Sequence, residues 1–227
     1  MSKRIGLIVA MDSEYRLTAG LLDAAEEVSD GVFKASKGRV GENEVIVAKS
    51  GIGKVSAAVG AVEMIRRFSP DCIINSGVGG GIDPEVKVMD VVVSTSVVYH
   101  DVWCGPNNAY GQVEGMPPVF PCDAGLIERF KAEKMPALYG MICCGDKFIS
   151  EPAELKCIKA EFPEGLAVDM ESAAIAHVAY LYGCPFVAIR IISDTPGIEN
   201  NYAQYEDFWT LAPRKSFRII ETFLKII

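Results

Sequence analysis

The sequence has few metal-binding side chains and no paired cysteine motif. Histidine occurs only at His100 and His177, so a zinc or iron site would need an unusual set of ligands. The seven cysteines are odd in number and irregularly spaced, and no C-x-x-C pair occurs. This pattern is typical of reduced thiols. We therefore predict a protein with no bound metal and no cofactor.

Positive charge is also in short supply. The chain has 22 Lys and Arg against 30 Asp and Glu, which gives a formal net charge of -8. Proteins that bind DNA or RNA favour a positive surface, so we exclude nucleic acids and anionic membranes as partners. The apolar run that begins at Ile5 is interrupted by Asp12, Glu14 and Arg16, too early for a secretion signal. We predict a strand there and a cytoplasmic protein.

Apolar residues, in contrast, are plentiful. Half of the residues are hydrophobic and 23% are charged, a composition that can bury a large core. A length of 227 residues lies within the range of compact α/β proteins that fold as one unit. We predict a single domain spanning residues 1–227.

Hydrophobic patterning predicts alternating strands and helices. Short, β-rich apolar runs predict strands at Ile5–Met11, Val32–Val40, Glu44–Ser50, Cys72–Ser76, Val88–Val98, Leu138–Cys144, Leu166–Met170 and Phe186–Ser193. Helices are predicted at about Ser13–Glu26, from Gly51–Lys54 to about Phe68, at Pro152–Glu161 and Glu171–Leu181, and over most of Tyr205–Ile227. Gly77–Gly81 and the segment from His100 to Asp123 are predicted loops. This order predicts an α/β three-layer sandwich, with a central mixed, largely parallel sheet flanked by helices.

Three carboxylates directly follow predicted strands. Glu14, Glu171 and Asp194 stand after Ile5–Met11, Leu166–Met170 and Phe186–Ser193, respectively. Ligands of open α/β sheets gather at the carboxyl ends of strands, so the three acids are candidates for one site. Each could instead cap a helix, because an acid is stabilised near a helix N-terminus.

Arg190 is a permanent cation inside a strand that is otherwise apolar. Its burial is costly unless a carboxylate compensates the charge. In a regular strand Arg190 and Asp194 would share a face at roughly 13 Å, a separation that spans a small ligand. The alternative is a structural ion pair.

Other candidates have equally simple structural explanations. Gly77–Gly81 and Gly51–Lys54 match neither a P-loop nor the full dinucleotide motif, and either could be a tight turn. Phe148 could stack on a planar base or belong to the core. His100, beside Asp101, could be a base or a structurally hydrogen-bonded histidine.

Several short motifs, taken in order, resemble the 5′-methylthioadenosine/S-adenosylhomocysteine nucleosidases of the nucleoside phosphorylase superfamily. The resemblance covers nearly the whole chain, and the ordered set is far more specific than any one motif. The motifs are Ala10–Glu14, Ser50–Lys54, Asn75–Gly81, Tyr99–Asp101, Gly145–Ile149, Val168–Glu171 and Ile189–Asp194.

The resemblance implies a metal-free hydrolase that releases adenine from a 5′-modified nucleoside. Asp194 would protonate N7 of adenine, Glu14 would activate the attacking water, and Arg190 would help to hold that water. Such a division suits an oxocarbenium-like transition state, which needs an acid for the leaving base and negative charge near the sugar.

The resemblance also implies a set of substrate-binding residues. Glu171 would bind the ribose hydroxyls and Met170 would pack on the sugar. Phe148 and the backbone of Ile149 would recognise adenine. The remaining expected contacts of the substrate are Ala10, Ile52, Val78 and Ser193.

Two features depart from the family pattern. Val78 stands where the glycine-rich segment usually carries a serine, whose hydroxyl is expected near the nucleophile. The segment from Val102 to Pro121, which helps to form the thioether pocket and the dimer contact in relatives, differs in length and composition. The preferred 5′ substituent is therefore left open.

Three alternative functions fit the same residues. A purine nucleoside phosphorylase would need to hold phosphate, for which Arg16 is the available cation, but Asn75 and Val78 near the glycine-rich segment and Glu14 beside the first strand favour water. A hydrolase for another nucleoside such as futalosine, or a nucleoside-binding protein without activity, also fits. Because relatives are dimers, we expect a homodimer.

Overall fold

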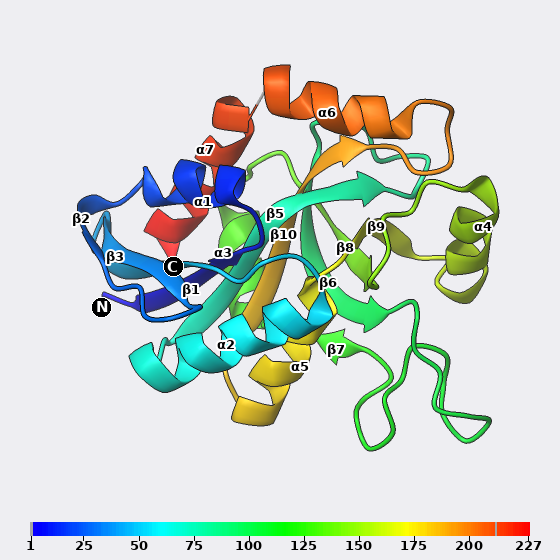
Figure 1. Cartoon of the computed structure of the whole chain (residues 1–227), viewed down its shortest axis with the longest axis horizontal. Helices are drawn as coiled ribbons and strands as arrows, with labels where there is room; N and C mark the ends of the chain where they lie inside the picture. The colour runs from blue at the N-terminus through cyan, green and yellow to red at the C-terminus, as the bar shows by residue number, and fades with distance from the viewer. Residues whose placement is uncertain (1, 212) are drawn as a thin grey trace.

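A mixed β-sheet runs through the molecule, with helices on both of its faces (Figure 1). The computed structural model describes residues 2–211 and 213–227. The strands are β1 Arg4–Val9, β2 Asp23–Glu27, β3 Lys34–Val40, β4 Asn43–Lys49, β5 Cys72–Gly81, β6 Val91–Tyr99, β7 Phe120–Pro121, β8 Leu138–Cys144, β9 Gly165–Asp169 and β10 Phe186–Asp194. The helices are α1 Asp12–Ala19, α2 Lys54–Phe68, α3 Ala124–Ala132, α4 Pro152–Glu161, α5 Ser172–Tyr182, α6 Asn201–Leu211 and α7 Pro213–Ile226.

The strand order is β10-β6-β8-β9-β5-β1-β4-β3-β2, and β10 also pairs with β5. The strands β5, β10, β6, β8 and β9 therefore form a closed ring, and β1 to β4 extend from it. Parallel pairings join β4, β1, β5 and β10 in turn, and also β6, β8 and β9. Antiparallel pairings join β10 to β6, β5 to β9, and the outer strands to each other.

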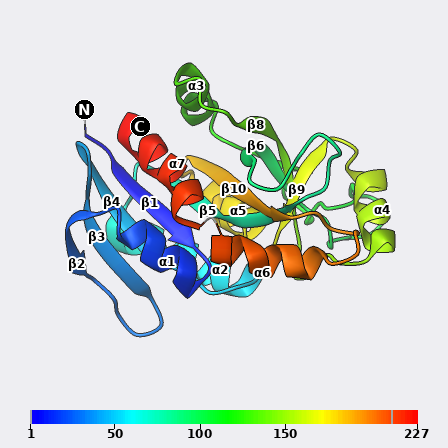
Figure 2. The ribbon, with the colours of Figure 1, turned by 90° about the horizontal axis from the view of Figure 1, so that it is seen from above.

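The central strands are buried along almost their whole length. Every residue of β10 is buried, and β5 is buried except at Val78. Helix α5 is buried over most of its length and packs against α2. On the opposite side, α7 packs on α1 and α3, as the view from above shows (Figure 2). Strands covered on both faces explain why they are continuous apolar runs in the sequence.

Local sequence explains where several helices begin and end. The Asp123 carboxylate accepts the Leu126 amide at 2.8 Å and caps the start of α3. Pro152 begins α4, where its missing amide hydrogen costs nothing. Gly183, with φ of 66°, ends α5 in the left-handed conformation that glycine adopts readily.

The predicted helix over Ser13–Glu26 is wrong in its second half. Helix α1 ends at Ala19, and Asp23–Glu27 forms the edge strand β2 beside β3. All five residues of β2 are exposed, so their pattern carries no sign of a buried face. Gly38 of β3 permits the pairing, because a Cβ there would lie 2.8 Å from the Asp23 carbonyl oxygen. Pairing with β3, rather than its own sequence pattern, therefore makes this segment a strand.

The predicted loop over Gly77–Gly81 is also wrong, because β5 continues through all five residues. Their backbone pairs with β10 on one side and, at Gly80 and Gly81, with β9 on the other. A Cβ on Gly79 would lie 2.8 Å from the Val168 carbonyl oxygen. The glycines therefore allow three strands to approach closely.

Substitution of Gly79 tests this explanation. Gly79→Ala is expected to lower the free energy of unfolding by about 1–3 kcal/mol, because the new methyl group meets backbone that can yield only if β9 moves. Chemical denaturation followed by circular dichroism measures the change. In the control Gly125→Ala the methyl group meets only the Asp123 side chain, at 3.2 Å, and little change is expected. Equal stabilities for both variants would contradict the explanation.

Candidate active site

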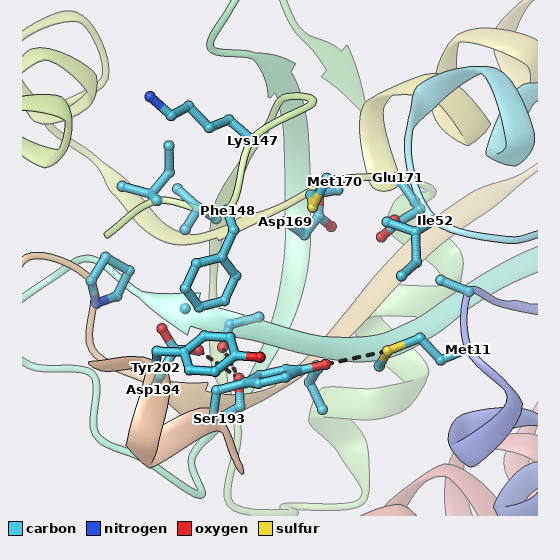
Figure 3. A pocket seen from close by; sticks show the side chains of 18 of the residues that line it. Met11, Ile52, Lys147, Phe148, Asp169, Met170, Glu171, Ser193, Asp194 and Tyr202 are labelled. Carbon is cyan, nitrogen blue, oxygen red and sulfur yellow. Dashed lines mark hydrogen bonds between the residues drawn. The ribbon is translucent and has the colours of Figure 1, made fainter. Parts of the chain in front are cut away.

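A cavity of about 320 Å³ lies where β1, β5, β9 and β10 meet the loops that follow them. Glu14, Glu171 and Asp194 all line it, although they come from distant parts of the chain. Helix α6 closes one side with Tyr202 and Tyr205 (Figure 3). The volume is at the lower end of the range for small-molecule sites. The convergence expected from the ends of the strands is thus present in the structure.

Glu14 is buried in the first turn of α1, immediately after β1. Its carboxylate accepts the amides of Ala10 at 2.9 Å and Met11 at 3.0 Å on one oxygen, and the amide of Val78 at 3.1 Å on the other. The bond from Met11 is the capping contact considered as an alternative. Glu14 therefore caps α1 and lines the cavity at once. Desolvation raises its pKa, although the three amides and the charge of Arg190 oppose the rise.

Glu171 has a different environment. It stands just before α5, but it makes no side-chain cap there. Its carboxylate instead accepts the Gly53 amide at 2.9 Å, at the start of α2. Burial, and then the nearby charge of Asp169, raise the pKa of the Glu171 carboxyl to about 7. Glu171 therefore does not cap α5, the helix that follows it, but it accepts an amide at the start of α2.

The raised pKa of Glu171 predicts a pH-dependent cost in stability. Between about pH 4.5 and pH 7 the unfolded chain loses a proton that the folded protein keeps, so stability falls as pH rises through this window. Glu171→Gln can still accept the Gly53 amide and has no charge to bury. We expect it to be more stable than the wild type by about 2–3 kcal/mol at pH 8, with no gain near pH 4.5.

Thermal unfolding of both proteins at the two pH values measures this difference. The same exchange at the exposed Glu42 is the control, and it is expected to give no gain at either pH. A stability difference for Glu171→Gln that does not change with pH would contradict the raised pKa.

Asp194 ends β10 and is buried. One carboxylate oxygen accepts the Ser193 hydroxyl at 2.7 Å, and the other lies 3.5 Å from the Asn201 amide nitrogen of α6. Neither contact is a helix cap. Burial raises the pKa of Asp194, while the two hydrogen-bond donors oppose the rise. Asn201 also donates to the Ile149 carbonyl oxygen at 3.1 Å. It therefore joins the start of α6 to the segment that follows β8.

Arg190 does not line the cavity directly. Its guanidinium forms an ion pair with Asp169 at 2.6 Å and donates to the Asn75 carbonyl oxygen at 3.1 Å. The predicted spacing of Arg190 and Asp194 along a regular strand does not apply, because the pairing of β10 with β5 shifts register between Ile192 and Asp194. The structural ion pair considered as an alternative is what the geometry contains.

The charge of Arg190 nevertheless acts on the cavity. It opposes the rise in the pKa values of Glu14 and Glu171, which both line the cavity. Asp169 lines the cavity as well as pairing with Arg190. The buried Arg190 cation therefore offsets the negative charge of three carboxylates, those of Asp169, Glu14 and Glu171.

The other predicted site residues also meet at this cavity. Phe148 and Tyr202 lie toward the Asp194 end, whereas Ile52 and Met170 lie near Glu171 (Figure 3). The predicted contacts that line the cavity are Ala10, Ile52, Val78, Phe148, Ile149, Met170 and Ser193. The Phe148 ring packs edge-on against Tyr202 and Tyr205, at centroid distances of 5.9 Å and 5.7 Å.

Sequence reasoning missed several lining residues. Tyr205 donates its hydroxyl to the Met11 sulfur at 3.3 Å and joins α6 to the start of α1. The missed residues are Met11, Lys147, Val168, Asp169, Pro196, Tyr202 and Tyr205, with Gly79 and Gly80. No motif marks the tyrosines; only their positions, eight and eleven residues beyond Asp194, could have suggested them.

His100 lies outside this cavity. It is buried, and desolvation lowers its pKa. Within the described ranges, no three His, Cys, Asp or Glu side chains are arranged to hold a metal ion. None of the helices in those ranges is long and apolar enough to cross a membrane.

Comparison with known proteins identifies the family. The model of the phosphorylase superfamily matches residues 4–225. A 5′-methylthioadenosine/S-adenosylhomocysteine nucleosidase of Geobacillus thermodenitrificans is 37% identical over 230 residues, which cover 99% of this chain and 97% of the relative. This chain belongs to the 5′-methylthioadenosine/S-adenosylhomocysteine nucleosidases of the phosphorylase superfamily.

Solved structures from this nucleosidase family have the same fold. The S-adenosylhomocysteine nucleosidase of Streptococcus pyogenes, in complex with 5-methylthiotubericidin, superposes with a TM-score of 0.93 at 35% identity, covering 99% of this chain and 97% of that one. The nucleosidase of Colwellia psychrerythraea, in complex with adenine, gives 0.92 at 32% identity, covering 100% and 96%. The predicted mixed α/β fold and the resemblance are confirmed.

Proposed function

We propose that the protein hydrolyses the N-glycosidic bond of 5′-methylthioadenosine, S-adenosylhomocysteine or a related 5′-modified adenine nucleoside, releasing adenine and the ribose moiety. The observation that carries this proposal is the meeting of Glu14, Glu171 and Asp194, in three different environments, around one cavity. The activity named for its relatives and the adenine bound by the Colwellia nucleosidase support it. The whole chain would act as one catalytic domain.

In this proposal Asp194 is the general acid. A buried carboxyl whose pKa is raised can keep its proton near neutral pH and pass it to N7 as the base leaves. The Ser193 hydroxyl donates to one carboxylate oxygen, and the other oxygen, at the longer distance of 3.5 Å from the Asn201 amide nitrogen, is the one that would carry the proton to the base. Protonation makes adenine a better leaving group.

Glu14 would orient and deprotonate the attacking water. Three backbone amides hold its carboxylate rigidly, and a fixed base reduces the entropy lost on reaching the transition state. The contact with the Val78 amide uses backbone, so it does not require a side-chain hydroxyl at position 78. Arg190, paired with Asp169, would help to hold that water through its charge.

Glu171 and Met170 would bind the ribose. Glu171 lies beside Ile52 on the side of the cavity away from Asp194 (Figure 3), so a nucleoside can extend from one acid to the other. Negative charge there also favours the cationic sugar of the transition state. Phe148, together with the backbone of Ile149, would recognise the base, and Ala10, Ile52, Val78 and Ser193 complete the proposed contacts.

Water rather than phosphate is the proposed nucleophile. Among the described residues that line the cavity, Lys147 is the cation, and its side chain extends away from the acids (Figure 3). Arg16, the candidate anion ligand of a phosphorylase, is exposed and does not line the cavity. A phosphorylase would need cations in contact with its phosphate.

The test is release of adenine from 5′-methylthioadenosine, measured by chromatography with and without phosphate. Equal rates and a free sugar product are expected. Strict dependence on phosphate, with a sugar 1-phosphate as product, would overturn the hydrolase. A panel that includes S-adenosylhomocysteine, 5′-deoxyadenosine, inosine and futalosine would rank the 5′ substituents and the bases.

We also propose that the protein forms a homodimer and is located in the cytoplasm. Trp103 is 63% exposed and Tyr110 is 42% exposed in the segment between β6 and β7, and large exposed apolar side chains favour a protein interface. All seven cysteines are free thiols, which suits a reducing compartment. Analytical ultracentrifugation tests the dimer.

A further inference from the structure

Three charged residues from the sequence motifs have no place in the proposed chemistry. Lys54, Asp101 and Asp146 come from three separate motifs, and none of them lines the cavity. In the structure they meet. The Lys54 ammonium lies 2.8 Å from both oxygens of Asp101, and Asp101 also accepts the backbone amide of Asp146 at 2.9 Å.

The cluster closes on itself through the backbone. The amide of Lys54 donates to the Asp146 carboxylate at 2.7 Å, and the Lys54 ammonium lies 3.8 Å from the same carboxylate. Each residue therefore contacts the other two. Three segments, at the start of α2 and after β6 and β8, are held together at one point.

Both ends of this cluster connect to the cavity. Gly53, next to Lys54, donates its amide to Glu171 at 2.9 Å. Asp146 stands two residues before Phe148, which lines the same cavity at a distance from Glu171, toward the Asp194 end (Figure 3). Gly53 has φ of 89°, and a Cβ there would lie 3.1 Å from the Asp146 carboxylate, so this close approach requires glycine.

We propose that Lys54, Asp101 and Asp146 are positioning residues that fix the Glu171 carboxylate relative to the segment that carries Phe148 and Ile149. The inference rests on the proposed function, in which Glu171 binds the ribose and that segment binds the base. A nucleoside would then meet both groups at one preset separation. Such preorganisation favours reaction, because small errors in position reduce the rate steeply.

The cluster holds three segments in place but contributes little to the free energy of unfolding. The side chains of Lys54 and Asp101 are 22% and 30% exposed, and ion pairs open to solvent contribute little to folding. Loss of the Lys54 charge should therefore leave a folded protein. Its effect should fall on the placement of Gly53, and hence on Glu171.

The test compares 5′-methylthioadenosine with its 2′-deoxy counterpart. In Lys54→Met we expect kcat/KM for the ribonucleoside to fall about tenfold, because a displaced Glu171 no longer meets the 2′-hydroxyl. For the 2′-deoxy substrate, which lacks that contact, we expect a fall of less than about twofold. The ratio of kcat/KM for the ribonucleoside to kcat/KM for the 2′-deoxy substrate should therefore fall. A general structural defect would lower both values and leave this ratio unchanged. Lys54→Arg can still hold the Asp101 carboxylate and should keep most of the preference.

Arg67 offers a matched control at the other end of α2. It pairs with Asp30 and Glu63 and lies 5.4 Å from the centre of the Phe33 ring. Lys54 likewise pairs with two carboxylates and lies 5.4 Å from the centre of an aromatic ring, that of Tyr99. Arg67→Met should leave the substrate preference unchanged.

The possible results separate this inference from the proposed function. No adenine release by the wild-type protein would overturn the proposed function, and this inference with it. An active wild type with the same preference in Lys54→Met would overturn only the positioning role, as would equal losses on both substrates. If Lys54→Met does not fold, Asp101→Asn decides: a narrowed preference supports the role, and an unchanged preference overturns it.

Discussion

Asp194→Asn is expected to reduce adenine release from 5′-methylthioadenosine by about 10²–10⁴-fold, the usual contribution of a positioned general acid. Asparagine has the same shape, and its carbonyl oxygen can still accept the Ser193 hydroxyl, which lies 2.7 Å from the carboxylate. What the variant lacks is a proton to give to N7. Initial rates measured by chromatography check this prediction.

The pH profile makes the prediction for Asp194 sharper. Burial raises the pKa of the wild-type carboxyl, so activity should fall as pH rises through that value and the donor loses its proton. The residual activity of Asp194→Asn should lack this alkaline limb. Thermal unfolding serves as the control for folding, and Asp83→Asn, an exchange outside the cavity, should retain the wild-type rate. Full activity in Asp194→Asn would show that another group donates the proton.

Glu14→Gln is expected to reduce hydrolysis by a similar factor, about 10²–10⁴-fold, while nucleoside binding persists. The neutral amide cannot take a proton from water. Because both carboxylate oxygens of Glu14 accept backbone amides, the new NH₂ group must face a donor in either orientation. We therefore also expect a loss of about 1–3 kcal/mol in stability.

Two measurements separate the two effects of Glu14→Gln. Calorimetric titration with 5′-methylthioadenosine should still detect binding, since the proposed contacts with the base and ribose remain. Rates measured well below the melting temperature should show the full loss of turnover. Near-normal hydrolysis would remove Glu14 from the mechanism, and loss of all binding would make its role structural.

The carboxylates illustrate how far the sequence could predict the site. Glu14, Glu171 and Asp194 each follow a buried strand, and strands of an α/β sheet end near one another, so their meeting could be expected. Their hydrogen bonds could not. Glu14 accepts a hydrogen bond from the backbone amide of Val78, which is 64 residues away in the chain, and Glu171 accepts one from the amide of Gly53, which is 118 residues away.

Errors in the predicted elements have the same origin. Gly77–Gly81 resembles a loop because glycine is rare inside strands, but here β5 pairs with both β10 and β9, and a Cβ on Gly79 would lie only 2.8 Å from the Val168 carbonyl oxygen of β9. Asp23–Glu27 resembles the end of a helix, but β3 recruits it as an edge strand. In both segments a neighbouring strand overrode the local preference.

The amino-acid sequence alone determined most of the strands and helices, the family, and the chemical types of side chain available for catalysis. These depend on the spacing of apolar residues and on short motifs, which are local properties. Tertiary structure alone decided that Arg190 pairs with Asp169, that α6 brings two tyrosines to the cavity, and that Lys54, Asp101 and Asp146 meet. Such contacts join residues far apart in the chain, and their strength depends on burial and direction, which exist only after the chain has folded.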